Sequence, residues 1–114
     1  SLNFNEMIQK IAENKYFPIL AHPERYIYLH QSTKYEHYKN NGVLFQINLL
    51  SLGDYYGKEV KEIAHKLLSK NLIDFAGTDI HNNKQMDVLK KIKISNKIAN
   101  QLIPVLERTK NNFS

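Results

Sequence analysis

Apolar residues along the chain follow two different spacings. Three short apolar runs bounded by polar residues predict buried β-strands, and they cover residues 16–21 (YFPILA), 43–47 (VLFQI) and 72–76 (LIDFA). Elsewhere apolar residues recur every three or four positions, which predicts amphipathic helices. The expected helices cover residues 5–14, 32–41, 58–70, 84–93 and 95–110. Pro104 lies inside the last of them and is expected to kink or restart it.

The order of these elements indicates an α/β fold with parallel strands and covering helices. Strands alternate with helices, and each strand is an apolar run, which is typical of parallel strands covered on their faces. At 114 residues the chain fits a single domain, residues 1–114. Three strands are few for a complete barrel, and the chain begins Ser-Leu without an initiator methionine. We therefore expect the C-terminal part of a longer (β/α) barrel.

The composition is that of a soluble globular protein, with 42% hydrophobic and 24% charged residues. No apolar run approaches the roughly 20 residues of a membrane span, and no signal peptide opens the chain. These features predict a cytoplasmic protein that does not span a membrane. The chain has no cysteine, which excludes disulfides and a cysteine nucleophile.

The net charge of +5 arises entirely within residues 84–114, where Asp87 and Glu107 are the only acidic residues. This basic segment could attract an acidic or phosphorylated partner, or it could be a solvated helix face. The second interpretation is favoured. Aromatic residues do not interleave with these lysines and no nucleic-acid-binding motif is present, so no nucleic-acid partner is expected.

Polar clusters follow the first and third predicted strands, in the sequences AHPERY and GTDIHN. The carboxyl ends of parallel strands meet at one edge of a sheet, where active sites form. Asp79 and His81 are two residues apart, so in extended backbone they point to the same side. Together with His22 they offer imidazole and carboxylate ligands for zinc, manganese or iron. Arg25 adds a planar guanidinium that suits phosphate oxygens.

Each cluster by itself has a structural interpretation. A histidine at a strand end is often simply hydrogen-bonded, and HPER could be a surface turn in which Glu24 pairs with Arg25. The occurrence of both clusters at strand ends favours a shared metal site instead. The other histidines, His30, His37 and His65, are expected to be surface or packing residues, because they lie in a polar loop or within predicted helices.

AHPERY and GTDIHN, with QINLLSL between them, resemble the C-terminal half of the CpsB/CapC-type bacterial tyrosine-protein phosphatases. These belong to the PHP (polymerase and histidinol phosphatase) superfamily. The resemblance implies a seven-stranded (β/α) barrel that holds divalent metal ions, commonly manganese, with iron or zinc as alternatives. It also implies hydrolysis of phosphotyrosine on kinases that control capsule or exopolysaccharide export. By position, His22, Asp79 and His81 match metal ligands, and Arg25 matches the catalytic, phosphate-binding arginine.

The chain departs from the family pattern because the opening H-x-H pair and the early-strand ligands have no counterpart. We expect them upstream of Ser1. Three alternatives stay open to different degrees. A histidinol-phosphatase of the same superfamily is compatible with these residues, whereas a TatD-type nuclease is disfavoured because Asp79 is not followed by x-Pro. An inactive half-barrel would expose strand edges and apolar helix faces, which favours a homo-oligomer.

Overall fold

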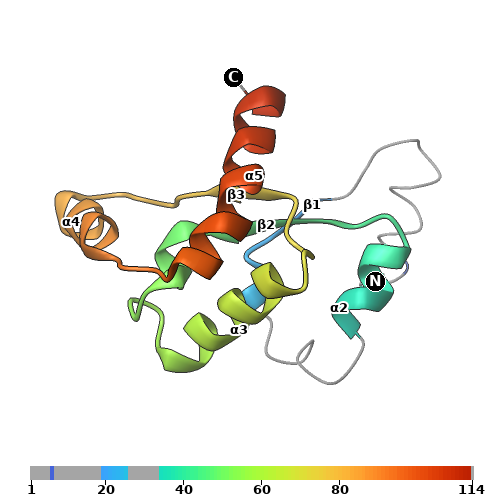
Figure 1. Ribbon diagram of the computed structural model, residues 1–114, viewed down its shortest axis with the longest axis horizontal. Coiled ribbons are helices and arrows are strands. Elements are labelled where there is room, and N and C mark those ends of the chain that lie inside the picture. The colour runs from blue at the N-terminus through green and yellow to red at the C-terminus, as the bar shows by residue number, and fades with distance from the viewer. Residues whose placement is uncertain (1–5, 7–18, 26–33, 114) are drawn as a thin grey trace.

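The computed structural model describes Glu6, residues 19–25 and residues 34–113 of the 114-residue chain, except for the side chain of Arg25. Three parallel strands form one sheet in the order β1 (Ile19–Ala21), β2 (Leu44–Asn48) and β3 (Phe75–Gly77) (Figure 1). The α-helices are α2 (Lys34–Asn40), α3 (Lys58–Ser69), α4 (Asn83–Lys91) and α5 (Asn96–Phe113). Two 3-10 helices, η1 (Pro23–Arg25) and η3 (Leu49–Leu52), closely follow β1 and β2. The predicted α/β class with parallel strands is confirmed.

Within the described residues, every predicted strand and helix is present, with shifted ends. The helix predicted at 58–70 agrees most closely with its observed counterpart, α3. Strand β3 begins three residues later than predicted, at Phe75. Asp74 explains this delay. Its N–H donates to the Phe45 carbonyl at 2.9 Å, but the Phe45 N–H is accepted by the Asp74 carboxylate at 2.8 Å and not by a backbone carbonyl of the preceding residues. The same carboxylate also accepts from the Lys39 ammonium. Of the helix predicted at 5–14, only Glu6 is described, and it is helical; residues 16–18, 32 and 33 also lie outside the described ranges.

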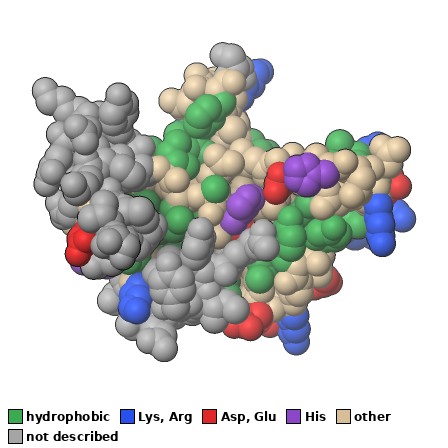
Figure 2. Space-filling model, turned by 180° about the vertical axis from the view of Figure 1, so that it is seen from behind, with side chains coloured by type: hydrophobic (Ala, Val, Ile, Leu, Met, Phe, Trp, Pro, Cys, Tyr) green, Lys and Arg blue, Asp and Glu red, His purple; other side chains and the backbone are tan. Residues whose placement is uncertain are grey.

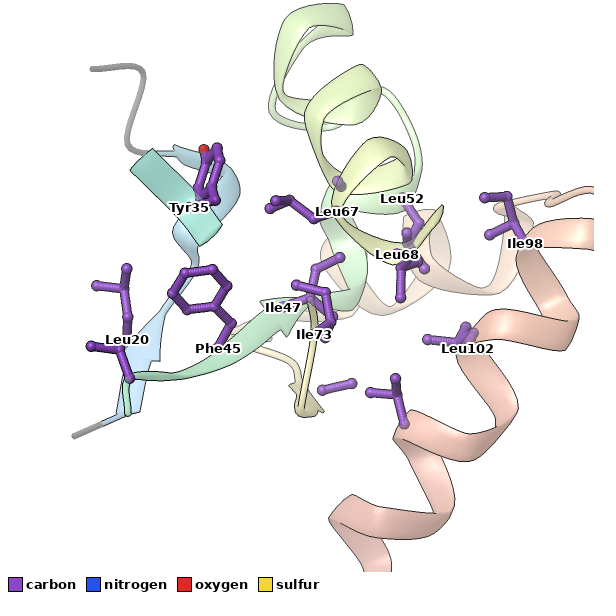
Figure 3. Packing of buried hydrophobic residues seen from close by; sticks show 14 of the residues in the cluster. Leu20, Tyr35, Phe45, Ile47, Leu52, Leu67, Leu68, Ile73, Ile98 and Leu102 are labelled. Carbon is purple, nitrogen blue, oxygen red and sulfur yellow. The ribbon is translucent and has the colours of Figure 1, made fainter. Parts of the chain in front are cut away.

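One face of the sheet carries the hydrophobic core. Leu20 pairs in register with Phe45, and Ile47 pairs with Ala76, so these four side chains share that face. Phe45 and Ile47 are completely buried. Helices α2, α3 and α5 cover this face (Figure 3) with the buried residues Tyr35, Tyr38, Ala64, Leu67, Leu68, Ile98, Leu102 and Val105. The amphipathic pattern read from the sequence therefore identifies the faces of α3 and α5 that meet the sheet.

The opposite face of the sheet is less covered by the described part of the chain. Ile19 is 44% exposed there, and Gln46 is half-buried. Phe75 and Asn48 are buried exceptions on this face, and the ring of Phe75 packs edge-on against Phe113 with the ring centroids 4.9 Å apart. Burial consequently alternates along β1 and most of β2, and these strands are not buried on both faces as their apolar runs had suggested.

Helix α5 continues through Pro104, so the predicted restart does not occur. Ser95 helps to start this helix, because its hydroxyl oxygen accepts the Ile98 N–H at 3.2 Å. Proline removes one backbone donor from the helix. The packing of Ile98, Leu102 and Val105 on either side of Pro104 holds the helix against the core as a single element.

All seven Lys and Arg side chains of residues 84–114 are exposed. Figure 2 shows blue side chains at the end of the molecule formed by α4, a helix with no buried residue. This arrangement agrees with the interpretation of the basic segment as a solvated helix face. No helix in the described ranges combines the length and the apolar character that crossing a membrane requires.

Candidate functional site

His22 follows β1 directly and has an unusual backbone conformation. Its φ of 57° lies in the left-handed region, which costs a non-glycine residue about 1–3 kcal/mol unless its surroundings hold it there. A hydrogen bond from the His22 N–H to the Gln46 carbonyl, 2.8 Å long, fixes this conformation against β2. The side chain is partly buried, and its Nδ1 atom is buried without a hydrogen-bond partner in the described part of the chain.

Glu24 is completely buried, with 0% exposure, two positions after His22. Its Oε2 atom accepts hydrogen bonds from the Asn48 N–H at 3.1 Å and the Ser51 hydroxyl at 2.6 Å. Burial raises the pKa of this carboxyl, and the two hydrogen bonds oppose that rise by favouring the ionised form. The other oxygen, Oε1, is buried and has no hydrogen-bond partner in the described ranges.

Residues 22–25, which we call the β1-end turn, are therefore attached to the body of the protein at several points. The Tyr35 hydroxyl donates a 3.0 Å hydrogen bond to the Pro23 carbonyl, and η1 lies against α3. Pro23 and Glu24 are both buried, so the interpretation of HPER as a surface turn is wrong. The backbone of Arg25 belongs to η1, and its side chain lies outside the described part of the structure.

Residues 78–82, the β3-end loop, present the Asp79–His81 pair. His81 Nε2 lies 2.9 Å from Asp79 Oδ1, which confirms that the two side chains share one side of the chain. Both side chains are exposed, by 72% for His81 and 56% for Asp79. This loop consequently offers one nitrogen and one oxygen donor to the solvent.

Helix α4 and the connection after β2 support the β3-end loop through Gln85. The Gln85 Oε1 atom accepts the His81 N–H at 2.7 Å, and its amide group donates to the Tyr55 hydroxyl at 3.1 Å. Asn82 caps α4, because its Oδ1 atom accepts the Gln85 N–H at 2.8 Å. The loop is thus held mainly by short-range hydrogen bonds at the start of α4.

The three strands run parallel, with β2 between β1 and β3. The β1-end turn and the β3-end loop therefore lie at the same end of the sheet, where the carboxyl ends of the strands meet. Within the described ranges, no three His, Asp or Glu side chains form a group able to hold a metal ion. The assignment of His22, Asp79 and His81 as ligands of one metal site therefore stays a prediction. Their donor atoms, imidazole nitrogen and carboxylate oxygen, are chemically suited to it.

The remaining described histidines have structural surroundings, as expected. His65 on α3 contacts the Leu52 carbonyl through Nε2 at 3.0 Å. His37 is exposed on α2, where its ring packs edge-on against Tyr38. His30 lies outside the described residues.

Two residues that support the site were not identified from the sequence, namely Glu24 and Gln85. For Glu24, the signal is a charged residue that closely follows a buried strand and a proline. Asn48 ends the next strand and Ser51 follows it, and both can donate hydrogen bonds to a buried carboxylate. For Gln85, the signal is the Asn82 cap three residues earlier, which places the glutamine in the first turn of α4.

Comparison with known proteins identifies relatives of this chain. The family described as "Capsular polysaccharide synthesis, CpsB/CapC" matches residues 2–101. The tyrosine-protein phosphatase YwqE of Bacillus subtilis is 36% identical over 70 residues, which cover 60% of this chain and 28% of YwqE. The putative tyrosine-protein phosphatase CapC of Staphylococcus aureus is 32% identical over 79 residues, which cover 68% of this chain and 31% of CapC.

A solved structure shares the fold. It comes from crystal structures of YwqE from Bacillus subtilis and CpsB from Streptococcus pneumoniae, described as unique metal-dependent tyrosine phosphatases. The TM-score is 0.64 at 24% sequence identity, over 96% of this chain and 50% of that one. The chain thus spans less than a third of the two curated relatives and half of the solved chain. Because the family match covers most of the sequence, the chain belongs to the CpsB/CapC family.

Proposed function

We propose that this chain forms the C-terminal part of a metal-dependent protein-tyrosine phosphatase. The observation that carries this proposal is that strands β1 and β3 end at the same end of the sheet. His22 follows β1 there, and Asp79 and His81 follow β3. The name of YwqE as a tyrosine-protein phosphatase supports the same interpretation. The domain would be a single unit, residues 1–114, of a PHP-type barrel.

The parallel sheet supports the barrel assignment. In a closed (β/α) barrel, helices cover the outer face of the strands and side chains fill the inside. Here α3 and α5 cover one face, and the face with Ile19 and Gln46 is the one that further strands would enclose.

The proposed site consists of three metal ligands and one phosphate-binding residue. His22, Asp79 and His81 would hold divalent metal, with Mn²⁺ as the expected ion and iron or zinc as alternatives. When bound, such ions lower the pKa of water and neutralise charge on phosphoryl oxygens. Arg25 would bind the phosphoryl oxygens and stabilise the charge that they gain during the reaction. A phenolate with a pKa near 10 leaves without a strong general acid, which suits phosphotyrosine.

The substrate class follows from the family. We infer that the partner is a tyrosine-phosphorylated kinase that acts in the export of capsule or exopolysaccharide, and that the enzyme works in the cytoplasm. The family description and the name of CapC support this inference.

The test is manganese-dependent hydrolysis of a tyrosine-phosphorylated peptide by this chain and by a full-length parent protein. We expect turnover by the parent, and a loss of about 10²-fold or more in both Arg25→Ala and Asp79→Ala variants with little change in folding. His37→Ala is the control, because this exposed residue of α2 belongs to neither the β1-end turn nor the β3-end loop. Near-normal turnover in both variants would exclude the proposal. A higher rate on histidinol phosphate at equal concentration would favour the histidinol-phosphatase alternative.

An association module is the second candidate, and specific residues favour it. Helix α5 exposes Ile103 by 49%, Leu106 by 40% and Phe113 by 59%. Strand β1 also has no neighbouring strand on its outer side within the described residues, whereas α5 covers part of the β3 edge, where Thr109 Oγ1 accepts the Ala76 N–H at 2.9 Å. A homo-oligomer would cover these apolar groups. Light scattering tests this, because a monomer over the whole concentration range would exclude self-association by this chain.

A further inference from the structure

Tyr55 and Tyr56, which we call the tyrosine pair, lie in the connection between η3 and α3, at the end of the sheet that carries the candidate site. Their rings pack edge-on with the centroids 5.0 Å apart. Tyr55 is 40% exposed and Tyr56 is half-buried. Neither residue belongs to the buried hydrophobic cluster, so their hydrogen bonds are the contacts that define their role.

The Tyr56 hydroxyl joins the tyrosine pair to the rigid part of the site. It accepts a 3.0 Å hydrogen bond from Nδ2 of Asn48, a completely buried residue whose N–H donates to Glu24 in the β1-end turn. Asn48 Oδ1 accepts the Leu50 N–H at 3.0 Å. Because a backbone N–H can only donate, this bond determines that the NH₂ group of Asn48 faces Tyr56. Tyr56 is therefore held by a residue that also holds the β1-end turn.

The Tyr55 hydroxyl joins the tyrosine pair to the β3-end loop. Gln85 Nε2 donates to this hydroxyl at 3.1 Å, and Gln85 Oε1 accepts the His81 N–H at 2.7 Å. The backbone N–H of His81 again determines which end of the amide faces the tyrosine. A single carboxamide group thus connects Tyr55 to the backbone of a predicted metal ligand.

We propose that the tyrosine pair positions the β3-end loop relative to the β1-end turn, and so sets the distance between the predicted metal ligands at the two strand ends. Tyr55 and Tyr56 are positioning residues, because they reach His81 only through Gln85. The exposed side chains of the loop are still free to rotate. The inference rests on the proposed function, because residues of both regions are taken to be metal ligands.

The packing of the same connection against α4 supports this role. Gly53 lies so close to Ile92, which ends α4, that an added Cβ would be 2.9 Å from Ile92 Cγ1. The connection between η3 and α3 therefore contacts α4 at its first turn, through Gln85, and at its end, through Ile92. Helix α4 has no buried residue of its own, so contacts of this kind determine where the helix and the loop before it lie.

The support acts in one direction, from the turn to the loop. Asn48 is completely buried and bonded to Glu24, so loss of its contact with the tyrosine pair should leave the β1-end turn in place. Asp79 and His81 are more than half exposed. The β3-end loop is therefore the region that should move when the tyrosine pair is disturbed.

The first experiment is Tyr55→Phe in this chain without metal, which removes the hydroxyl group and keeps the ring packing. Exchange of backbone amides with water, measured by NMR, reports on the loop. We expect exchange at the His81 N–H to accelerate severalfold and exchange at Asn48 to stay unchanged. Tyr38→Phe is the matched control, because it makes the same substitution on α2, and it should leave His81 unchanged. Unchanged exchange at His81 in Tyr55→Phe would overturn the inference.

The other end of the tyrosine pair provides a second variant. Tyr56→Phe removes the acceptor of Asn48 Nδ2 and leaves the contact between Tyr55 and Gln85 intact. Exchange at His81 should accelerate here too, by less than in Tyr55→Phe. Unchanged exchange at His81 would show that the loop is not tied to Asn48 and would overturn the inference, even if Tyr55→Phe failed to fold.

A double variant tests the route of the effect. If Tyr55 acts on the loop through Gln85, adding Tyr55→Phe to Gln85→Ala should change the exchange at His81 no further than Gln85→Ala does. Additive effects of the two substitutions would contradict this route and overturn the inference.

Metal affinity gives a readout that a merely structural contact between exposed residues would not change. In the full-length parent, Tyr55→Phe should weaken Mn²⁺ binding by about 10-fold, while the urea midpoint stays close to that of wild type. Saturating Mn²⁺ should then restore turnover, because the substitution moves ligands and removes none. Tyr38→Phe should leave the Mn²⁺ affinity unchanged. Equal Mn²⁺ affinity for wild type and Tyr55→Phe would overturn the inference.

The inference and the proposed function can fail separately. A parent without phosphatase activity, together with accelerated exchange at His81 in Tyr55→Phe, would exclude the proposed function and keep the positioning of the loop. An active phosphatase in which Tyr55→Phe changes neither the exchange at His81 nor the Mn²⁺ affinity would do the opposite.

Discussion

The β1-end turn and the β3-end loop carry the two halves of the candidate site, yet they are built in opposite ways. Glu24 in the turn is completely buried and is bonded to two residues of another strand and its extension, η3. Asp79 and His81 in the loop are more than half exposed, and their side chains bond to each other. Folding therefore fixes the position of His22, whereas the Asp79–His81 pair keeps freedom to adjust to a ligand.

Strand β2 is the support that the two regions share. The Gln46 carbonyl accepts the His22 N–H at 2.8 Å. The Gln46 side chain reaches Gly77 at the end of β3, where an added Cβ would lie 2.7 Å from its amide nitrogen. Gln46 thus contacts the ends of both β1 and β3, which carry the candidate site. A change at Gln46 should therefore change the distance between the β1-end turn and the β3-end loop.

The largest expected effect is the difference in the free energy of unfolding between Glu24→Ala and Asp79→Ala. Loss of the Glu24 carboxylate leaves the Asn48 N–H and the Ser51 hydroxyl buried without their acceptor and opens a cavity. We expect a loss of about 3 kcal/mol in the free energy of unfolding. Asp79→Ala should cost less than about 0.5 kcal/mol, because a contact between two exposed side chains contributes little.

Urea unfolding followed by circular dichroism measures both values. Glu24→Gln separates charge from hydrogen bonding, since its amide oxygen can keep both donors and the variant should be closer to wild type than Glu24→Ala. Equal losses in Glu24→Ala and Asp79→Ala would show that the two regions do not differ in how they are held.

The contrast also explains which parts of the structure could be predicted from the sequence. The spacing of apolar residues is a property of nearby positions in the sequence. It was therefore sufficient to identify α3 and the ends of β1 and β3, where the polar clusters lie. The burial of Glu24 depends on Asn48 and Ser51, which are 24 and 27 positions away in the sequence. HPER by itself does not contain that information, because the two donors belong to the end of the next strand, and a surface turn therefore remained an open interpretation of HPER.

The start of β3 shows the same limitation. LIDFA is a continuous apolar run apart from Asp74, and the strand was expected to begin at Leu72. The Asp74 carboxylate accepts the N–H of Phe45, 29 positions earlier, and the Asp74 N–H donates to the Phe45 carbonyl at 2.9 Å, so backbone bonding between β2 and β3 begins at this residue. The type of element was determined by local sequence, while its boundary was determined by a tertiary contact.

Gly77→Ala tests the shared support on β2. The new methyl group would meet the Gln46 side chain at 2.7 Å, and the end of that flexible side chain can move away. We expect a loss of about 1 kcal/mol in the free energy of unfolding, smaller than that of Glu24→Ala. Gly42→Ala is an unsuitable control because its φ of 87° adds strain, so Ala76→Gly, the neighbouring β3 residue on the other face, is used instead.

The structural consequence can be read by NMR. Displacement of the Gln46 side chain in Gly77→Ala should change the amide resonances of both His22, which follows β1, and Thr78, which follows β3. A change confined to β3 would contradict the view that β2 couples the two regions.

Gln85→Ala tests the support of the β3-end loop. The substitution removes the acceptor of the His81 N–H and the donor to Tyr55. Both bonds are exposed, so the free energy of unfolding should fall by about 0.5 kcal/mol. Amide hydrogen exchange should accelerate at His81 and stay unchanged at Asn48, whose N–H is bonded to Glu24. Equal acceleration at both sites would contradict the independence of the loop from the turn.

The smallest expected effect concerns Glu36, a carboxylate that is neither buried like Glu24 nor part of the β3-end loop. Its Oε1 atom lies 3.2 Å from Lys70 Nζ, and its side chain is 35% exposed. A hydrogen bond from its own backbone N–H, followed by the contact with Lys70, holds the pKa of Glu36 below its usual value. The direction is opposite to that at Glu24, where burial raises the pKa.

The sign of the pH effect follows from this direction. A carboxyl with a lowered pKa in the folded state binds fewer protons than in the unfolded state, so its contribution is present above its ordinary pKa and disappears as the pH falls through the lowered value. The free energy of unfolding of wild type should exceed that of Glu36→Gln by about 0.3 kcal/mol near pH 7, and this difference should vanish in acid. A difference that grows toward low pH would contradict the assignment. Because the pair is partly exposed, salt should reduce the difference at pH 7, whereas the larger loss caused by Glu24→Ala should persist.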